Sequence, residues 1–133
     1  MSTNEPNLTN CKIGQLIEKD GHKGIYIGKI GEKSIVVDLY DAPKTMTWDE
    51  AMDYAKKEGK RLPTQQELFL MFIHKKELNE GLKNTGGQLW DTSWYWSSSE
   101  FDDNSAWIVT ASKGYVNSYY KGFKIYHVRC LLN

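Results

Sequence analysis

Side chains that could do chemistry lie along this 133-residue chain in spacings that common catalytic sites do not use. The three histidines, His22, His74 and His127, lack metal-ligand spacing such as HExxH, and we interpret them as surface or sheet residues. Serines 97–99 lack the Gly-x-Ser-x-Gly turn and an adjacent base, which argues against a serine nucleophile. The sequence therefore predicts no enzyme activity and no cofactor.

An acidic segment follows these serines. Glu100, Asp102, Asp103 and Asn104 could offer oxygen ligands to Ca²⁺, but they lack both the spacing and the glycine of an EF-hand loop. The sequence favours a solvated acidic turn over a metal site.

The two cysteines, Cys11 and Cys130, stand near opposite ends of the chain. One disulfide could join them, but two cysteines do not make a disulfide framework, and cytosolic proteins rarely keep disulfides. We therefore predict thiols, with Cys130 acting as a small buried apolar residue.

Aromatic residues make up 13% of the chain, with five Trp and eight Tyr, which exceeds the usual need of a core of this size. We expect a surface that uses them, where Tyr and Trp stack on a sugar face or anchor in a protein groove. The candidate ligand-binding residues lie beside turns in the C-terminal half and are Trp94, Asn117, Tyr119, Tyr120 and Lys121. Alternatively, the aromatic members of this set cap the core, as we expect of Trp48, Trp96 and Trp107.

The charge balance and the hydropathy limit the choice of partner. The 17 basic and 17 acidic residues cancel, so nothing favours nucleic acid or an anionic membrane. Residues 1–10 are polar and lack a signal-peptide pattern, which predicts a flexible or partner-bound arm before a single domain over 11–133. No stretch is long enough to span a bilayer, so we expect no membrane insertion and a cytoplasmic location on synthesis.

The elements that position these side chains follow from periodicity and turn signals. Two β-branched runs at 24–30 and 34–40 flank a glycine-containing turn and predict an N-terminal hairpin. Thr47 and Glu50 form a capping box for a first helix. Its buried stripe would be Trp48, Ala51, Met52 and Ala55.

A second capping box, Thr64 with Glu67, predicts a second helix from Gln65. The apolar run at 68–73 leaves this helix hardly any polar face and predicts burial on most sides. Residues 79–92 contain three glycines and predict an irregular loop.

The rest of the chain has a β pattern. Runs at 94–100, 105–111 and 115–120 predict three strands, the second with Trp107, Val109 and Ala111 on one face. A last strand at 124–132 would place Tyr126, Val128, Cys130 and Leu132 on one side, and His127 and Arg129 on the other. Arg129 is assigned a structural role. A hairpin, two helices and a meander predict an α+β fold.

Short motifs in a fixed order carry a resemblance to a known family. They are Trp48 with Ala51, GKRLPTQQEL at 59–68, YWSSS at 95–99, Ala106-Trp107, Gly114, and Val-Arg-Cys at 128–130. Over residues 24–132 the chain resembles the bacterial and phage domain of unknown function DUF1566, related to the Lcl C-terminal domain. The resemblance implies a C-type lectin-type fold, in which two helices flank a small twisted antiparallel sheet.

The same resemblance implies a binding scaffold of the kind found in adhesins, surface lipoproteins and phage receptor-binding or decoration proteins. Vertebrate-type C-type lectins chelate calcium through Glu-Pro-Asn and Trp-Asn-Asp triplets, and residues 24–132 contain neither, so calcium-dependent sugar binding is not expected. Formylglycine-generating enzymes share the scaffold but use two nearby reactive cysteines, a site that Cys11 and Cys130 do not build.

Three functional hypotheses follow. The first is a non-enzymatic binding or recognition module for a glycan or protein ligand, with a phage-encoded receptor-binding or adhesion domain as one form of it. The second is a structural or decoration component of a virion or larger assembly, which could include copies of this chain. The third is an enzyme on the formylglycine-generating scaffold.

Overall fold

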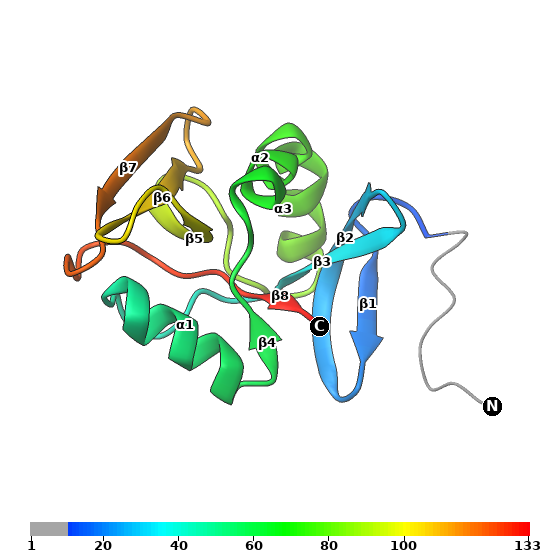
Figure 1. Cartoon of the computed structure of the whole chain (residues 1–133). Helices are drawn as coiled ribbons and strands as arrows, with labels where there is room; N and C mark the ends of the chain where they lie inside the picture. Colours follow the sequence, from blue (N-terminus) through cyan, green and yellow to red (C-terminus); the bar gives the residue numbers. More distant parts are fainter. Residues whose placement is uncertain (1–10) are drawn as a thin grey trace.

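The computed structural model describes residues 11–133, which form three helices and eight strands in two antiparallel sheets (Figure 1). The five-stranded sheet has the order β1 (Leu16–Lys19), β2 (His22–Ile30), β3 (Lys33–Asp38), β8 (Leu131–Leu132) and β4 (Lys60–Arg61). The three-stranded sheet has the order β5 (Trp94–Glu100), β6 (Ser105–Thr110) and β7 (Val116–Tyr120). The helices are α1 (Trp48–Lys57), α2 (Gln65–Ile73) and α3 (Lys75–Asn84). This arrangement confirms the predicted α+β class.

The predicted N-terminal hairpin is confirmed and has one more strand than expected. Strands β2 and β3 pair antiparallel, and β1 pairs with β2 on the other side. Asp20 and Gly21 connect β1 to β2 with φ angles of 53° and 81°. Two consecutive residues with positive φ are the mark of the tight hairpin turn that an Asp-Gly pair favours.

Both predicted capping boxes are present, and both helices begin where the sequence places them. Thr47 Oγ1 accepts from the Glu50 N–H at 3.2 Å, and Glu50 accepts from the Thr47 N–H at 2.9 Å. Thr64 and Glu67 repeat this geometry at 3.1 and 2.8 Å. Each box satisfies N–H groups that the first turn of a helix would otherwise leave unpaired.

The prediction that the second helix is buried on most sides is wrong in part. Leu68 and Met71 of α2 are buried, whereas Phe69 is exposed and Ile73 is 67% exposed. Helix α2 contacts β2, β5 and β6, so it lies against strands of both sheets with one face and meets solvent with the other.

The prediction of an irregular loop over 79–92 is wrong in part: residues up to Asn84 belong to α3, whereas residues 85–92 are irregular, as predicted. Gly81 lies in the middle of this helix and is buried. A Cβ atom at Gly81 would collide with the Gly14 carbonyl oxygen and lie 3.0 Å from Ile25 Cγ2. The glycine therefore allows α3 to approach β2 closely, and tertiary packing outweighs its poor helix propensity. No helix within residues 11–133 has the length and apolarity needed to cross a membrane.

The C-terminal segment connects the two sheets, and only β8 of the predicted 124–132 strand is regular. The His127 N–H donates to the Trp94 carbonyl at 2.9 Å, and the Trp96 N–H donates to the His127 carbonyl at 3.1 Å. Three residues later, the Cys130 carbonyl accepts from the Asp38 N–H of β3 at 3.0 Å. The segment thus leaves β5 and joins the other sheet between β3 and β4, as its course in Figure 1 shows.

The core has two main apolar clusters. One joins β2, β3, α2, α3, β5, β6 and β8, and the other joins α1, β5, β6 and the C-terminal segment. Trp48 and Trp96 are in the second cluster, as predicted. Trp107 is not: it is half-buried and packs edge-to-face on Phe101, with ring centroids 5.1 Å apart. The fully buried tryptophan that the sequence analysis did not identify is Trp90.

Candidate ligand-binding site

A polar groove of about 300 Å³ lies where the turn after β5, the end of β7 and the start of α1 meet. Its lining residues are Thr47, Asp49, Asp103, Asn104, Tyr120, Lys121 and Gly122. Two predicted candidate binding residues, Tyr120 and Lys121, therefore lie beside two residues of the predicted acidic turn, Asp103 and Asn104. Sequence reasoning treated these pairs as separate features, and the fold brings them together.

Lys121 holds the walls of this groove in place. Its Nζ donates to Glu100 Oε2 and to the Asp103 carbonyl, both at 3.0 Å, and lies 4.4 Å from the centre of the Trp48 ring. Its backbone N–H donates to the Asn104 carbonyl at 2.8 Å, and its carbonyl accepts from the Trp48 N–H at 2.9 Å. Because its side chain is only 15% exposed and already bound, Lys121 positions the site rather than reaching out to a ligand.

Four other lining side chains remain available. The carboxylates of Asp49 and Asp103, the carboxamide of Asn104 and the hydroxyl of Tyr120 make no side-chain hydrogen bond or ion pair within residues 11–133. Carboxylates accept hydrogen bonds, a carboxamide both donates and accepts, and a tyrosine offers a ring face and a hydroxyl. This set can bind a polar ligand rich in hydroxyl groups, but it contains no nucleophile with a base beside it.

The Tyr120 ring is exposed yet held in one orientation. It is 56% exposed and packs edge-to-face on Phe123, with ring centroids 5.5 Å apart. A Cβ atom at Gly122 would collide with the Tyr120 ring and lie 2.9 Å from its Cζ atom. Gly122 therefore allows the ring to lie directly over the backbone beside the groove.

The other predicted binding residues do not line the groove. Trp94 pairs with Thr110 and Tyr119 with Ala106, so the two lie four residues apart along β6, about 13 Å. Trp94 packs against the second apolar cluster, as the alternative interpretation expected. Tyr119 packs on Tyr126 with ring centroids 5.4 Å apart, and the exposed Asn117 accepts from the Ser118 N–H at 2.9 Å.

The acidic turn is exposed and internally hydrogen-bonded. Asp102 Oδ1 accepts from the Asn104 N–H at 2.9 Å, and Glu100 is paired with Lys121. No group of three or more His, Cys, Asp or Glu side chains within residues 11–133 is placed to hold a metal ion. The Glu-Pro-Asn triplet at 5–7 and the predicted arm at 1–10 lie outside the described residues.

The cysteines occur as thiols, as predicted, with Cys11 half-buried and Cys130 buried. Burial in the second cluster raises the pKa of the Cys130 thiol to about 12. Because the thiolate is the nucleophilic form, Cys130 is unreactive at neutral pH.

Three groove residues, Thr47, Asp49 and Gly122, were not among the predicted site residues. Thr47 and Asp49 carry a local signal only for the start of a helix. The start of this helix lies beside the end of β7 because the Trp48 N–H donates to the Lys121 carbonyl. No spacing in the sequence indicates this hydrogen bond.

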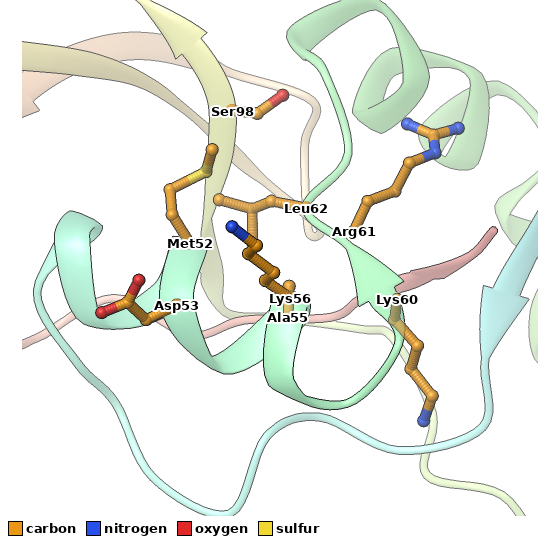
Figure 2. Close-up of a pocket in the computed structure, with 8 residues that line it drawn as sticks. All are labelled: Met52, Asp53, Ala55, Lys56, Lys60, Arg61, Leu62 and Ser98. Atoms are coloured by element: carbon orange, nitrogen blue, oxygen red, sulfur yellow. The ribbon is translucent and has the colours of Figure 1, made fainter.

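A second hollow of about 440 Å³ lies farther along α1, between that helix, β4 and β5 (Figure 2). Its lining is mostly apolar, in contrast to the groove. Met52, Ala55 and Leu62 contribute the apolar surface, and Asp53, Lys56, Lys60, Arg61 and Ser98 complete it.

Comparison with known proteins gives one clear relationship. No curated protein matches the chain. The model of the Lcl C-terminal domain matches residues 20–132, which is most of the chain and nearly all of its described part. This match includes every strand except β1, all three helices and every residue of the groove, so the chain belongs to the Lcl C-terminal domain family.

Proposed function

We propose that this domain is a non-enzymatic recognition module that binds a glycan in the polar groove. One observation carries the proposal: polar side chains without a side-chain hydrogen bond or ion pair within residues 11–133 come together from three separate parts of the chain. They are Asp49, Asp103, Asn104 and Tyr120. Sugars present hydroxyl groups around an apolar ring face, which matches carboxylate and carboxamide groups beside an exposed aromatic ring.

The groove suits recognition better than catalysis. Its walls are held by backbone and Lys121 contacts, and its lining contains no nucleophile with a base beside it. Membership of the Lcl C-terminal domain family supports a non-catalytic domain. The C-type lectin-type scaffold that the sequence resembles is the fold we propose for it, supported by the α+β arrangement and the insertion of β8 between β3 and β4.

A protein ligand is the second candidate. Exposed apolar side chains can mark a protein interface, and three of them, Tyr115, Phe123 and Ile125, stand just before or just after β7 in the chain. A phage-encoded receptor-binding domain, or a decoration component of a virion, would use such a surface.

A glycan array probed with the purified chain tests the proposal. Retained signal on a defined glycan, weakened about tenfold or more by Tyr120→Ala, would support it, since a central aromatic anchor contributes on the order of 1–3 kcal/mol. Tyr115→Ala is the matched control, because Tyr115 is equally exposed but lies outside the groove. Binding should persist in EDTA. An array without signal, or a loss of signal with the control variant as large as with Tyr120→Ala, would contradict the proposal.

A further inference from the structure

The hollow beside the later turns of α1 has the form of a ligand pocket with an apolar floor. Ala55 and Leu62 are almost fully buried at its base, and the half-buried Met52 forms one side (Figure 2). Its volume of about 440 Å³ lies within the usual range of small-molecule sites. A bulky apolar group would replace water over this floor with favourable contacts.

Two of the three cations around the hollow are already neutralised. Lys60 Nζ lies 2.7 Å from Asp38 Oδ2, and the Arg61 guanidinium binds both oxygens of Glu67 at 2.7 and 2.6 Å. Figure 2 shows their charged ends turned away from Lys56. These two residues therefore line the hollow with their aliphatic stems, while their charges are directed elsewhere.

Lys56 is the cation that remains available. Its side chain makes no hydrogen bond or ion pair within residues 11–133, and Figure 2 places its amine in front of Leu62, over the hollow. The carboxylate of Asp53, one turn earlier on α1, points away from this amine in the same view and forms no ion pair with it. An unpaired ammonium beside an apolar floor attracts an anion attached to an apolar body.

Ser98 provides a hydroxyl to the same hollow. The hydroxyl groups of the neighbouring serines are already hydrogen-bonded. Ser97 Oγ donates to the Trp107 carbonyl at 2.7 Å, and Ser99 Oγ accepts from the Gln65 N–H at 3.0 Å. The Ser98 hydroxyl makes no hydrogen bond within the described residues, and its backbone N–H donates to the Pro63 carbonyl at 2.7 Å, which fixes its place. In Figure 2 this hydroxyl points away from the Lys56 amine, so it has to rotate about the Cα–Cβ bond to serve as a second donor to the same anionic group.

We propose that this hollow binds a bulky apolar group that carries an adjacent carboxylate. The apolar part lies over Ala55, Leu62 and Met52, and the carboxylate meets the Lys56 ammonium, with Ser98 as a hydrogen-bond donor. Both a free carboxylic acid and the C-terminal residue of a peptide have this chemistry. The proposal does not depend on glycan binding in the groove, which lies at the other end of α1.

NMR of methyl-labelled protein tests it with two probes of the same shape, 4-phenylbutanoate and 4-phenylbutan-1-ol. The acid should shift the methyl signals of Met52, Ala55 and Leu62 at millimolar concentration, and it should bind about fivefold more tightly than the alcohol, the size of a partly exposed ion pair. Lys56→Gln should abolish this preference. Lys57→Gln, the adjacent lysine, which lines a different cavity, should keep it.

A second arm separates the two sources of the ligand. A peptide Gly-Gly-Gly-Phe with a free C-terminus and the same peptide with an amidated C-terminus are titrated in the same way. Binding by the free peptide and not by the amide would assign the site to a chain terminus, and binding by the small acid alone would assign it to a free acid. Absence of methyl shifts with every probe, equal affinity for acid and alcohol, or a preference unaffected by Lys56→Gln would overturn the proposal.

Discussion

Arg129 and Asp41, 88 residues apart in the sequence, form an ion pair inside the fold, with Arg129 Nε 2.7 Å from Asp41 Oδ1. Both side chains are buried, and Tyr95 donates its hydroxyl to Asp41 Oδ2 at 2.8 Å. Arg129 also donates to the carbonyls of Asp38 and Gln88, at 3.1 and 2.8 Å. The pair thus joins the C-terminal segment to β5, to the exit of β3 and to the loop after α3.

Removing the cation should be strongly destabilising. Arg129→Met should lower the free energy of unfolding by about 3–5 kcal/mol, because the buried Asp41 carboxylate loses its counter-charge. Adding Asp41→Asn should recover part of this loss, since the two residues are coupled. Urea unfolding gives the comparison.

The control is an ion pair at the surface. Lys124→Met removes the exposed pair with Glu50, whose charged atoms are 3.5 Å apart, and should lower stability far less than Arg129→Met, because solvent screens an exposed pair. If Arg129→Met and Lys124→Met lower the free energy of unfolding by similar amounts, the Arg129 network contributes no more to stability than a surface contact.

Cys130 should make stability fall at alkaline pH. Burial raises the pKa of its thiol from 9.0 to about 12, so from pH 9 upward the unfolded chain loses this proton while the folded chain keeps it. The contribution to stability is complete below pH 9 and declines by about 1.4 kcal/mol per pH unit above it. Chemical unfolding at pH 8, 9 and 10 should show the decline in the parent and a smaller one in Cys130→Ala. Parallel curves would mean that the folded thiol ionises normally.

Local signals in the sequence located much of the fold correctly. The capping boxes at Thr47 and Thr64 depend on side chains that contact their own helix, so their meaning does not depend on distant residues. The Asp20-Gly21 turn carried an equally local signal, from which β1 could have been predicted. The three strands of the second sheet followed from short runs separated by turns.

The failures have a tertiary cause. Gly81 disfavours a helix unless β2 approaches so closely that a side chain would not fit, and that approach appears only in the folded chain. Asp41 and Arg129 are too far apart in sequence for any spacing rule to pair them. The groove could not be predicted for the same reason: Asp49, Asp103 and Tyr120 become neighbours only when α1 packs against the end of β7. The aromatic content of the sequence pointed to Tyr120 as a candidate binding residue, whereas the polar residues around it could be identified only from the structure.

Trp96 and Trp107 should respond very differently to truncation. Trp96 is fully buried and its Nε1 donates to the Met46 carbonyl at 2.9 Å, so Trp96→Ala should cost about 3–5 kcal/mol through the cavity it opens. Trp107 is half-buried against Phe101, so Trp107→Ala should cost about 1–2 kcal/mol. Thermal melts of the two variants measure this difference. A melting temperature for the Trp107 variant below that of the Trp96 variant would place Trp107 in the core, against its half-buried position on β6.

Tyr119 and Tyr120 are neighbours in sequence, but their substitution by Ala should have different effects: the first should lower stability and the second should weaken binding. Tyr119 pairs with Ala106 in the sheet and packs on the buried Tyr126, so Tyr119→Ala should lower the free energy of unfolding by about 1–2 kcal/mol. Tyr120 is exposed at the groove, so Tyr120→Ala should change stability by about 0.5 kcal/mol or less while weakening glycan retention about tenfold. Urea melts and array binding of the two variants provide both readouts. If Tyr119→Ala abolishes retention in a folded protein and Tyr120→Ala does not, the binding surface lies on the Tyr119 face of β7 and the groove is not the site.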